Sequence, residues 1–187
     1  PAVTALAATP ILTGVRLSWG TINSLRLKNY EVRIGDSWAT ATPLGVTKSS
    51  YLDIPPQSAG VKTFWVSSVD TLDNYGAAAS KSVTVLAPTE IMVTPKVIDN
   101  NVMLYWTEAA ITITTSQFSQ YIDFYEIRRG DTYANSALLG EVPGLFATFF
   151  ETIGTDYKYW VCAVDIAGNR GNAVNKLVTV DQPPDFI

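Results

Sequence analysis

The sequence contains no histidine and a single cysteine, Cys162. Without histidine, a Ser–His–Asp triad, a Cys–His dyad and any imidazole-ligated metal site are excluded. One cysteine permits no disulfide within the chain, and no apolar run approaches the roughly 20 residues of a membrane-spanning helix. These shortages remove most enzyme chemistries. We therefore predict a protein with no catalytic residues, no metal ion and no cofactor.

Charge is also scarce and slightly acidic, with 13 Lys and Arg against 17 Asp and Glu and a net charge of −4. Such a chain lacks the basic surface that holds nucleic acid or an anionic membrane, so we expect neither nucleic-acid binding nor membrane insertion. Of the 187 residues 47% are apolar, which is enough for a folded core. Because the sequence starts at Pro1, without an initiator Met or a signal-like segment, we expect a piece of a longer chain.

An internal repeat organises the sequence. VRLSW at Val15–Trp19 returns as VMLYW at Val102–Trp106, 87 positions later, and YEVRIGD at Tyr30–Asp36 returns as YEIRRGD at Tyr125–Asp131, 95 positions later. The change of offset places eight additional residues between the two motifs of the second copy. Repeats at such a period indicate that one structural unit is duplicated.

The predicted copies span residues 1–87 and 88–182, and residues 183–187 resemble the start of a further segment. Inside each copy apolar and polar residues alternate with period two, as in Val15, Leu17 and Trp19, which indicates half-buried antiparallel strands. Turn residues recur about every ten positions, the spacing of a β-sandwich. Seven strands are predicted near residues 3–7, 14–20, 29–34, 43–47, 51–54, 61–69 and 78–86, and seven more near 90–94, 101–106, 124–129, 138–142, 147–150, 157–165 and 174–180.

The order of these motifs resembles a fibronectin type III domain, and the resemblance covers essentially the whole chain twice. It rests on a Val-x-Leu-x-Trp strand, a Tyr-x-Val strand and the Tyr-x-Val-x-Ala-Val-Asp strand that starts at Tyr159. It implies an all-β chain of two tandem seven-stranded sandwiches, with Trp19 and Trp106 between the sheets. It also places the family's tyrosine corner, whose hydroxyl binds the backbone, on Tyr159. The first copy has Phe64 there, so we expect it to be the less stable copy.

A narrower resemblance comes from the connecting motifs. EIRRGD from Glu126, GDSWATATPLG from Gly35 and YWVCAVDIAGN from Tyr159 are similar to type III modules of the tail-tip host-specificity and central tail fibre proteins of long-tailed bacteriophages. This implies a structural or host-interaction module in the tail of a virion, outside the cell. The implied partners are other domains of the same chain, tail-protein subunits in an assembly usually built on a trimer, and a host-surface glycan or protein. Secreted bacterial carbohydrate-active enzymes and adhesins carry similar spacers, and that alternative stays open.

Two tryptophans at equivalent positions, Trp65 and Trp160, are candidates for a binding surface. Each has the opposite parity from the core-facing valine that follows it, Val66 or Val161, so we expect both indoles to face outward. Cys162 shares the parity of Trp160, and a partly exposed thiol is expected there.

The outward tryptophans have two interpretations. They can form an aromatic platform for sugar rings, or each can be covered by the arginine beside it, Arg33 or Arg128, in a cross-strand cation–π pair. The presence of the pair in both copies favours the structural interpretation. Trp38 and Tyr133 are also equivalent, and we expect them to cap an edge strand or the gap between the sheets, with glycan contact as the alternative.

The enlarged loop at 108–123 is the most individual feature of the second copy. Ile111 and Ile113 alternate like an edge ribbon, whereas Phe118, Tyr121 and Ile122 fit one or two turns of helix. These apolar side chains need cover. The loop either folds over the end of its own sandwich or packs against a neighbouring domain or subunit. The candidates for a subunit contact are Ile111, Ile113, Phe118 and Tyr121.

Two further motifs are interpreted as turns. Arg129–Asp131 spells the RGD tripeptide, but the first copy repeats its Gly-Asp pair at Gly35–Asp36, as a turn requires. Asp70 and Asp165 open loops rich in Asp and Asn that could bind Ca²⁺, and we favour a carboxylate that closes its own turn.

Overall fold

The computed structural model describes residues 1–181 except residues 12 and 115. The chain forms two compact units. Unit 1 comprises Pro1–Leu86 together with Thr112–Gln120, and unit 2 comprises Ala87–Ile111 together with the chain from Tyr121 onward. The main boundary agrees with the repeat, but nine residues of the enlarged loop belong to unit 1. The predicted segment at 183–187 lies outside the described residues.

All regular elements of the described chain are β-strands, and within it no helix has the length and apolarity needed to cross a membrane. The strands of unit 1 are β1 (Ala7–Ile11), β2 (Gly14–Ser18), β3 (Leu27–Ile34), β4 (Thr42–Thr47), β5 (Tyr51–Ile54), β6 (Gly60–Asp70), β7 (Ala79–Leu86) and β10 (Gln117–Ser119). The strands of unit 2 are β8 (Val93–Ile98), β9 (Asn101–Trp106), β11 (Ile122–Arg129), β12 (Ala137–Val142), β13 (Phe146–Phe150), β14 (Thr155–Asp165) and β15 (Val174–Val180).

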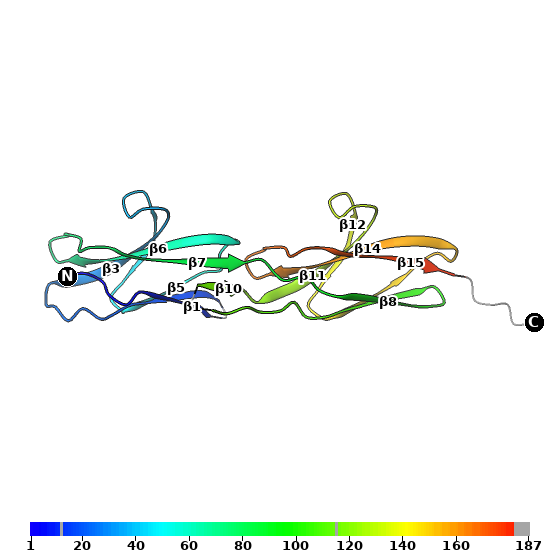
Figure 1. Cartoon of the computed structure of the whole chain (residues 1–187), viewed down its shortest axis with the longest axis horizontal. Helices are drawn as coiled ribbons and strands as arrows, with labels where there is room; N and C mark the ends of the chain where they lie inside the picture. Colours follow the sequence, from blue (N-terminus) through cyan, green and yellow to red (C-terminus); the bar gives the residue numbers. More distant parts are fainter. Residues whose placement is uncertain (12, 115, 182–187) are drawn as a thin grey trace, which may run out of the picture. The chain divides into compact units, whose positions relative to one another are not determined.

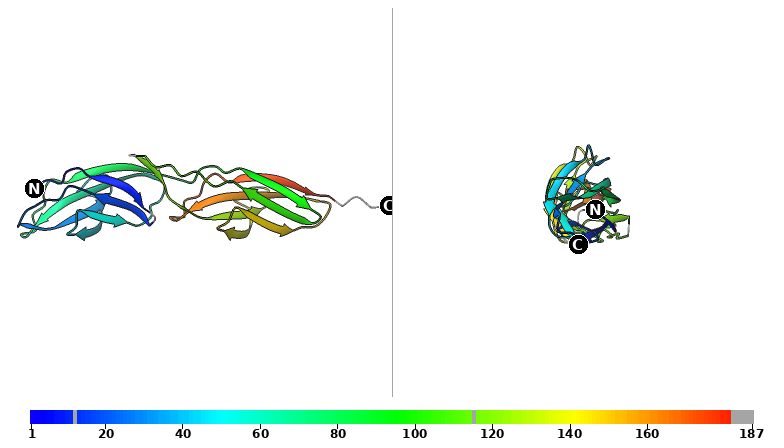
Figure 2. Two further views of the ribbon diagram at one scale, coloured as in Figure 1. Left: turned by 90° about the horizontal axis from the view of Figure 1, so that it is seen from below. Right: turned by 90° about the vertical axis from the view of Figure 1, so that its left-hand side faces the viewer.

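Each unit is a sandwich of two sheets (Figures 1 and 2). In unit 1 the sheets have the orders β1-β2-β5 and β10-β7-β6-β3-β4, and in unit 2 they have the orders β13-β9-β8 and β12-β11-β14-β15. Every pair is antiparallel except β10 with β7. Without β10, both units place their first, second and fifth strands in one sheet and the other four in the second. Apart from β10, each unit is thus a seven-stranded sandwich, and the predicted fold class, two tandem fibronectin type III sandwiches, is confirmed.

The predicted tryptophans lie in the cores. Trp19 and Trp106 are each 6% exposed, at the ends of the alternating strands that carry Leu17 and Leu104. Trp19 meets the ring of Tyr30 at 5.2 Å, and Trp106 meets its equivalent, Tyr125, at 5.5 Å. The alternation in sequence thus becomes one apolar face per strand, as the pleat requires.

The first strand of each unit begins later than predicted. The prediction placed these strands at 3–7 and 90–94, whereas β1 starts at Ala7 and β8 at Val93. Val3 is still buried, but Ala5 has a positive φ of 53°, which interrupts an extended strand. Pro10 is tolerated within β1 because β1 is an edge strand. No strand lies on its outer side, so the missing backbone N–H of proline costs no hydrogen bond of the sheet.

The tyrosine corner differs from the expectation in its partner. Tyr159 is fully buried, and its hydroxyl donates to the carboxylate of Glu151 rather than to the backbone. Arg129 also donates to this carboxylate. Unit 1 has none of the three groups, because Phe64, Ile34 and Pro56 occupy the equivalent positions.

We expect Tyr159→Phe to lower the free energy of unfolding of unit 2 by about 1.5–3 kcal/mol, since it removes a buried hydrogen bond to a charged acceptor. Chemical denaturation of the variant measures the loss. Tyr157→Phe is the control, because the Tyr157 hydroxyl bonds an exposed backbone N–H of Thr152. Equal losses in the two variants would contradict a special role for the Tyr159–Glu151 contact.

Candidate functional site

The enlarged loop of the second repeat forms a β-hairpin rather than a helix. The backbone N–H of Ser119 donates to the carbonyl of Thr112 at 2.7 Å, and that of Thr114 donates to Gln117 at 2.8 Å. The hydroxyl of Thr114 also accepts from the N–H of Gln117, which closes the turn. The predicted helical turn at Phe118 is therefore wrong: Phe118 lies in β10.

Strand β10 is the fifth strand of the sheet β10-β7-β6-β3-β4 in unit 1. Figure 1 shows it beside β7. It runs parallel to β7, with Phe118 beside Val85, and the N–H of Thr84 donates to the carbonyl of Ser116 at 2.8 Å. An edge strand exposes unpaired backbone groups, and a neighbouring strand satisfies them. The second repeat thus supplies a strand to the first.

The side chain of Phe118 completes the core of unit 1. It is 2% exposed and belongs to the apolar cluster that contains Val83 and Val85 of β7 and Trp19. Burying a phenylalanine removes roughly 150–250 Å² from water. Of the two predicted covers, the neighbouring domain is the one observed, and it belongs to the same chain. Phe118 has no surface left for another subunit, and its predicted subunit contact is corrected accordingly.

Two glutamines hold the end of the hairpin. Gln120 accepts the backbone N–H of Gln57 at 2.7 Å, and its amide nitrogen donates to the carbonyl of Gln57 at 2.7 Å. Gln120 is buried, so the oxygen and the nitrogen of its side-chain amide both exchange water for backbone partners. We call Thr112–Gln120 on β7 and Gln57 the strand clasp.

The other candidate contact residues of the loop stay accessible. Ile111, Ile113 and Tyr121 are 43%, 60% and 42% exposed. A contact of these three side chains with another subunit remains a prediction.

The four candidate aromatic residues are half-buried and engaged within their own units. Trp65 donates its indole N–H to the carbonyl of Gly35 at 2.8 Å, and Trp160 does the same to Gly130 at 2.9 Å. Each tryptophan therefore holds the loop that follows β3 or β11 by a hydrogen bond. Figure 1 shows the course of the two loops. Glycine is needed there, since a Cβ on Gly35 would lie 2.9 Å from the Cα of Ala41.

The cation–π contacts differ from those predicted. The guanidinium of Arg33 lies over Trp38 at 4.2 Å, although Arg33 is in register with Trp65. In unit 2, Arg128 lies 5.2 Å from the ring of Tyr133, and the cation over Trp160 is Lys158, at 5.0 Å. These contacts give the aromatic residues structural roles, and a glycan contact by them remains a prediction.

A buried carboxylate, Glu126, was not anticipated from the sequence. It is 1% exposed and accepts hydrogen bonds from Arg128, from the Tyr133 hydroxyl at 2.9 Å and from Arg170 at 3.0 Å. Burial alone would raise the pKa of Glu126, but its three donors outweigh burial and lower it. The repeat offered one signal, because Glu31 occupies the equivalent position.

The single thiol is also buried. Cys162 is fully covered, contrary to the partly exposed thiol that its parity suggested. Burial raises its pKa above the ordinary value, so the thiol is neutral at pH 7. A neutral and covered thiol is a poor nucleophile.

The acidic loops close their own turns, as predicted. Asp70 accepts from the backbone N–H of Leu72 and Asn74, and the hydrogen bonds of Asn74 lower the pKa of Asp70. The carboxylate of Asp165 likewise accepts hydrogen bonds from the backbone N–H groups of Ala167 and Asn169. Among the described residues, no three His, Cys, Asp or Glu side chains lie close enough together to hold a metal ion.

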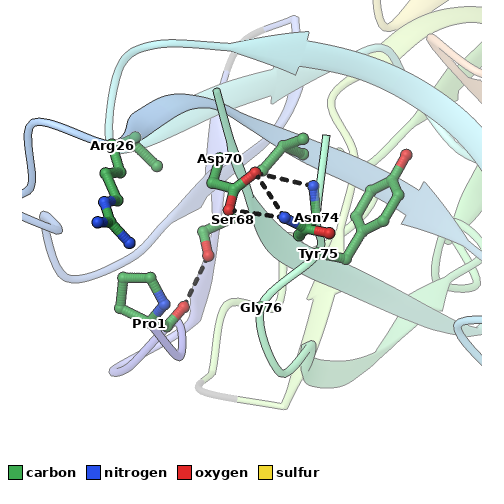
Figure 3. A pocket seen from close by; sticks show the side chains of 9 residues that line it. Pro1, Arg26, Ser68, Asp70, Asn74, Tyr75 and Gly76 are labelled. Carbon is green, nitrogen blue, oxygen red and sulfur yellow. Dashed lines mark hydrogen bonds between the residues drawn. The ribbon is translucent and has the colours of Figure 1, made fainter. Parts of the chain in front are cut away.

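The pocket beside Asp70 is small. Figure 3 shows Asp70 turned toward Asn74, with the Ser68 hydroxyl donating to the carbonyl of Pro1 at 2.6 Å. The volume of this pocket is about 90 Å³, well below the roughly 300–1,000 Å³ of small-molecule sites. These side chains tie the start of the chain to β6, and they leave no room for a substrate.

No protein-family model and no curated protein matches the sequence. Among solved structures, a chain described as "FN3tt mut" is 20% identical, with a TM-score of 0.42, over 52% of this chain and 100% of its own. A two-domain fibronectin type III segment of chicken tenascin is 13% identical, with a TM-score of 0.42, over 95% and 98% of the two chains. The central fibronectin type III array of RIM-binding protein is 11% identical, with a TM-score of 0.36, over 98% and 70%. The fold assignment rests on the strand order within each unit.

Proposed function

We propose that this chain is a non-catalytic structural module of a longer protein, in which two type III repeats are joined by a shared strand. The observation that carries the proposal is the strand clasp, which places Phe118 of the second repeat in the core of the first. If the repeats were joined only by a linker, each core would be built from the residues of its own repeat alone. The clasp makes unit 1 depend on residues of the second repeat, which suits a module that must stay assembled as part of a larger structure.

The finer proposal is that the longer protein belongs to the tail tip or tail fibre of a long-tailed bacteriophage. Its support is the sequence likeness of the motifs at Gly35, Glu126 and Tyr159 to tail modules. The chain would then lie outside the cell, among other tail-protein subunits, and would space or decorate the tip and contact the host surface. The second candidate function, a spacer of a secreted carbohydrate-active enzyme, is favoured only by the same kind of likeness.

Labelling with antibodies raised against this chain separates the two candidates. We expect gold-labelled antibody to decorate the tail end of intact virions in electron micrographs of the producing culture. If the antibody instead detects the chain in the fractions of culture supernatant that contain a soluble polysaccharide-degrading activity, the phage proposal is overturned. The control is antibody pre-absorbed with the purified chain, which should give no signal on virions or in the fractions.

A further inference from the structure

One sheet face of unit 2 exposes an unusual number of large apolar side chains. Alternate residues of the sheet β13-β9-β8 point away from the core, and we call these nine residues the aromatic face. Its members are Thr94, Lys96, Ile98, Asn101, Met103, Tyr105, Phe146, Thr148 and Phe150. Phe150 is 76% exposed, Phe146 61%, Ile98 47% and Tyr105 43%.

The equivalent face of unit 1 is charged. Arg16 and Asp53 stand there in register and form a two-bond ion pair at 2.6 and 2.7 Å, beside Tyr51. In unit 2 the same two positions are Met103 and Thr148, also in register. The fold therefore accepts a hydrated, charged surface at this place. Its apolar side chains in unit 2 are not required to build the sandwich.

The size of the aromatic face suits the core of a protein interface. At roughly 150–250 Å² per aromatic side chain, the exposed parts of Tyr105, Phe146 and Phe150 leave about 270–450 Å² of aromatic surface. This is the size of the largest apolar patches on monomers, which are often functional. A standard interface needs about 800 Å² per partner, with an apolar core and a polar rim. The aromatic face supplies the apolar part of such an area, with Thr148, Lys96 and Asn101 between its apolar side chains in the register.

We propose that the aromatic face binds the aromatic face of a second copy of this chain. A two-fold axis that runs parallel to the strands in the interface plane, in front of β9, makes the face complementary to itself, because β8 then lies opposite β13 of the partner subunit. Phe150 meets Ile98 of the partner subunit, and Tyr105 meets Tyr105 of the partner subunit. Flat sheet faces pack in this way about 10 Å apart.

Charge agrees with a second copy as the occupant. Lys96 is the only charged residue of the nine, and the two-fold arrangement sets it opposite Thr148 of the partner subunit, not opposite a second lysine. No carboxylate would be buried, although residues 89–187 hold twelve acidic side chains against six basic ones. These acidic groups lie off the face and repel one another, so we expect added salt to strengthen the dimer.

Sedimentation analysis of the whole chain tests the proposal. We expect the wild-type chain to pass from monomer to dimer between about 10 µM and 1 mM, a range typical of a weak interface. The variant Met103→Arg with Thr148→Asp copies the ion pair of unit 1 onto the face and should raise the dissociation constant at least ~30-fold. Phe146→Ser should act similarly. The matched control Tyr51→Ser, at the equivalent position of unit 1, should leave association unchanged.

Each outcome decides the proposal. A wild-type chain that stays monomeric to about 1 mM, or a dimer that survives both face variants, overturns it. A monomeric chain that binds an oligosaccharide or an unrelated protein only when the aromatic face is intact also overturns it, and assigns the face to that ligand. Far-ultraviolet circular dichroism confirms that each variant is folded. None of these results depends on whether the longer protein belongs to a phage tail.

Discussion

Replacing Phe118 with alanine will destabilise unit 1 by about 3–5 kcal/mol, although residue 118 lies within the second repeat of the sequence. The substitution leaves a cavity in the core beside Val85 and weakens the anchor of β10 on β7. None of the described hairpin residues belongs to the apolar core of unit 2, so unit 2 should keep its stability. Amide hydrogen exchange read peptide by peptide measures both effects, with β2 reporting on unit 1 and β9 on unit 2.

The control for this experiment is Ile113→Ala in the opposite strand of the same hairpin. Ile113 is 60% exposed, so its loss should change the stability of unit 1 by less than about 0.5 kcal/mol. If Phe118→Ala instead accelerated exchange in β9 and spared β2, Phe118 would belong to the core of its own repeat, and the strand clasp would be wrong.

Replacing Glu126 with alanine should cost unit 2 about 3–5 kcal/mol at pH 7, because it leaves Arg128 and Arg170 without their buried acceptor. The matched control is Glu31→Ala in unit 1. The Glu31 carboxylate is more exposed and has one arginine partner, Arg33, besides the Tyr75 hydroxyl. Its loss should cost clearly less.

The same carboxylate predicts how the stability of unit 2 depends on pH. The folded pKa of Glu126 lies below its ordinary value of 4.5. The unfolded chain therefore takes up this proton first as the pH falls, and the stabilisation by Glu126 is complete above about pH 4.5 and lost as the pH falls through the folded pKa. Denaturation curves at neutral and acid pH measure this slope. It should be shallower in Glu126→Ala, and an unchanged slope would contradict the assignment.

The strand clasp also explains a difference between the two cores. In unit 2, Tyr157 of β14 is in register with Val178 and packs against the core. Its equivalent in unit 1 is Lys62, which is in register with Val83 and sends its amine to Ser58. Unit 1 thus lacks an apolar side chain at this end of its sandwich. Phe118, brought in beside Val85, supplies one.

The sequence by itself determined the duplicated unit, the seven strands of each sandwich and the central tryptophans. These features depend on local alternation and on residues that recur at fixed offsets, as Trp19 and Trp106 do, and such patterns survive without knowledge of the fold. The turn-closing role of Asp70 and Asp165 was equally local, because each carboxylate bonds backbone groups two and four residues further along.

Only the tertiary structure decided which strand the hairpin pairs with and which side chains are buried. The apolar character of Phe118 shows that it needs burial, but any apolar surface satisfies that need, and the edge of β7 is a long-range partner. Parity correctly assigned Trp160 and Cys162 to the outer side of their sheet. Parity could not show that Cys162 and Glu126 are buried on that side. Strand alternation sets only the side of the sheet on which a side chain lies. The loop that carries Tyr133 and the side chain of Arg170 decide which residues on that side are exposed to water.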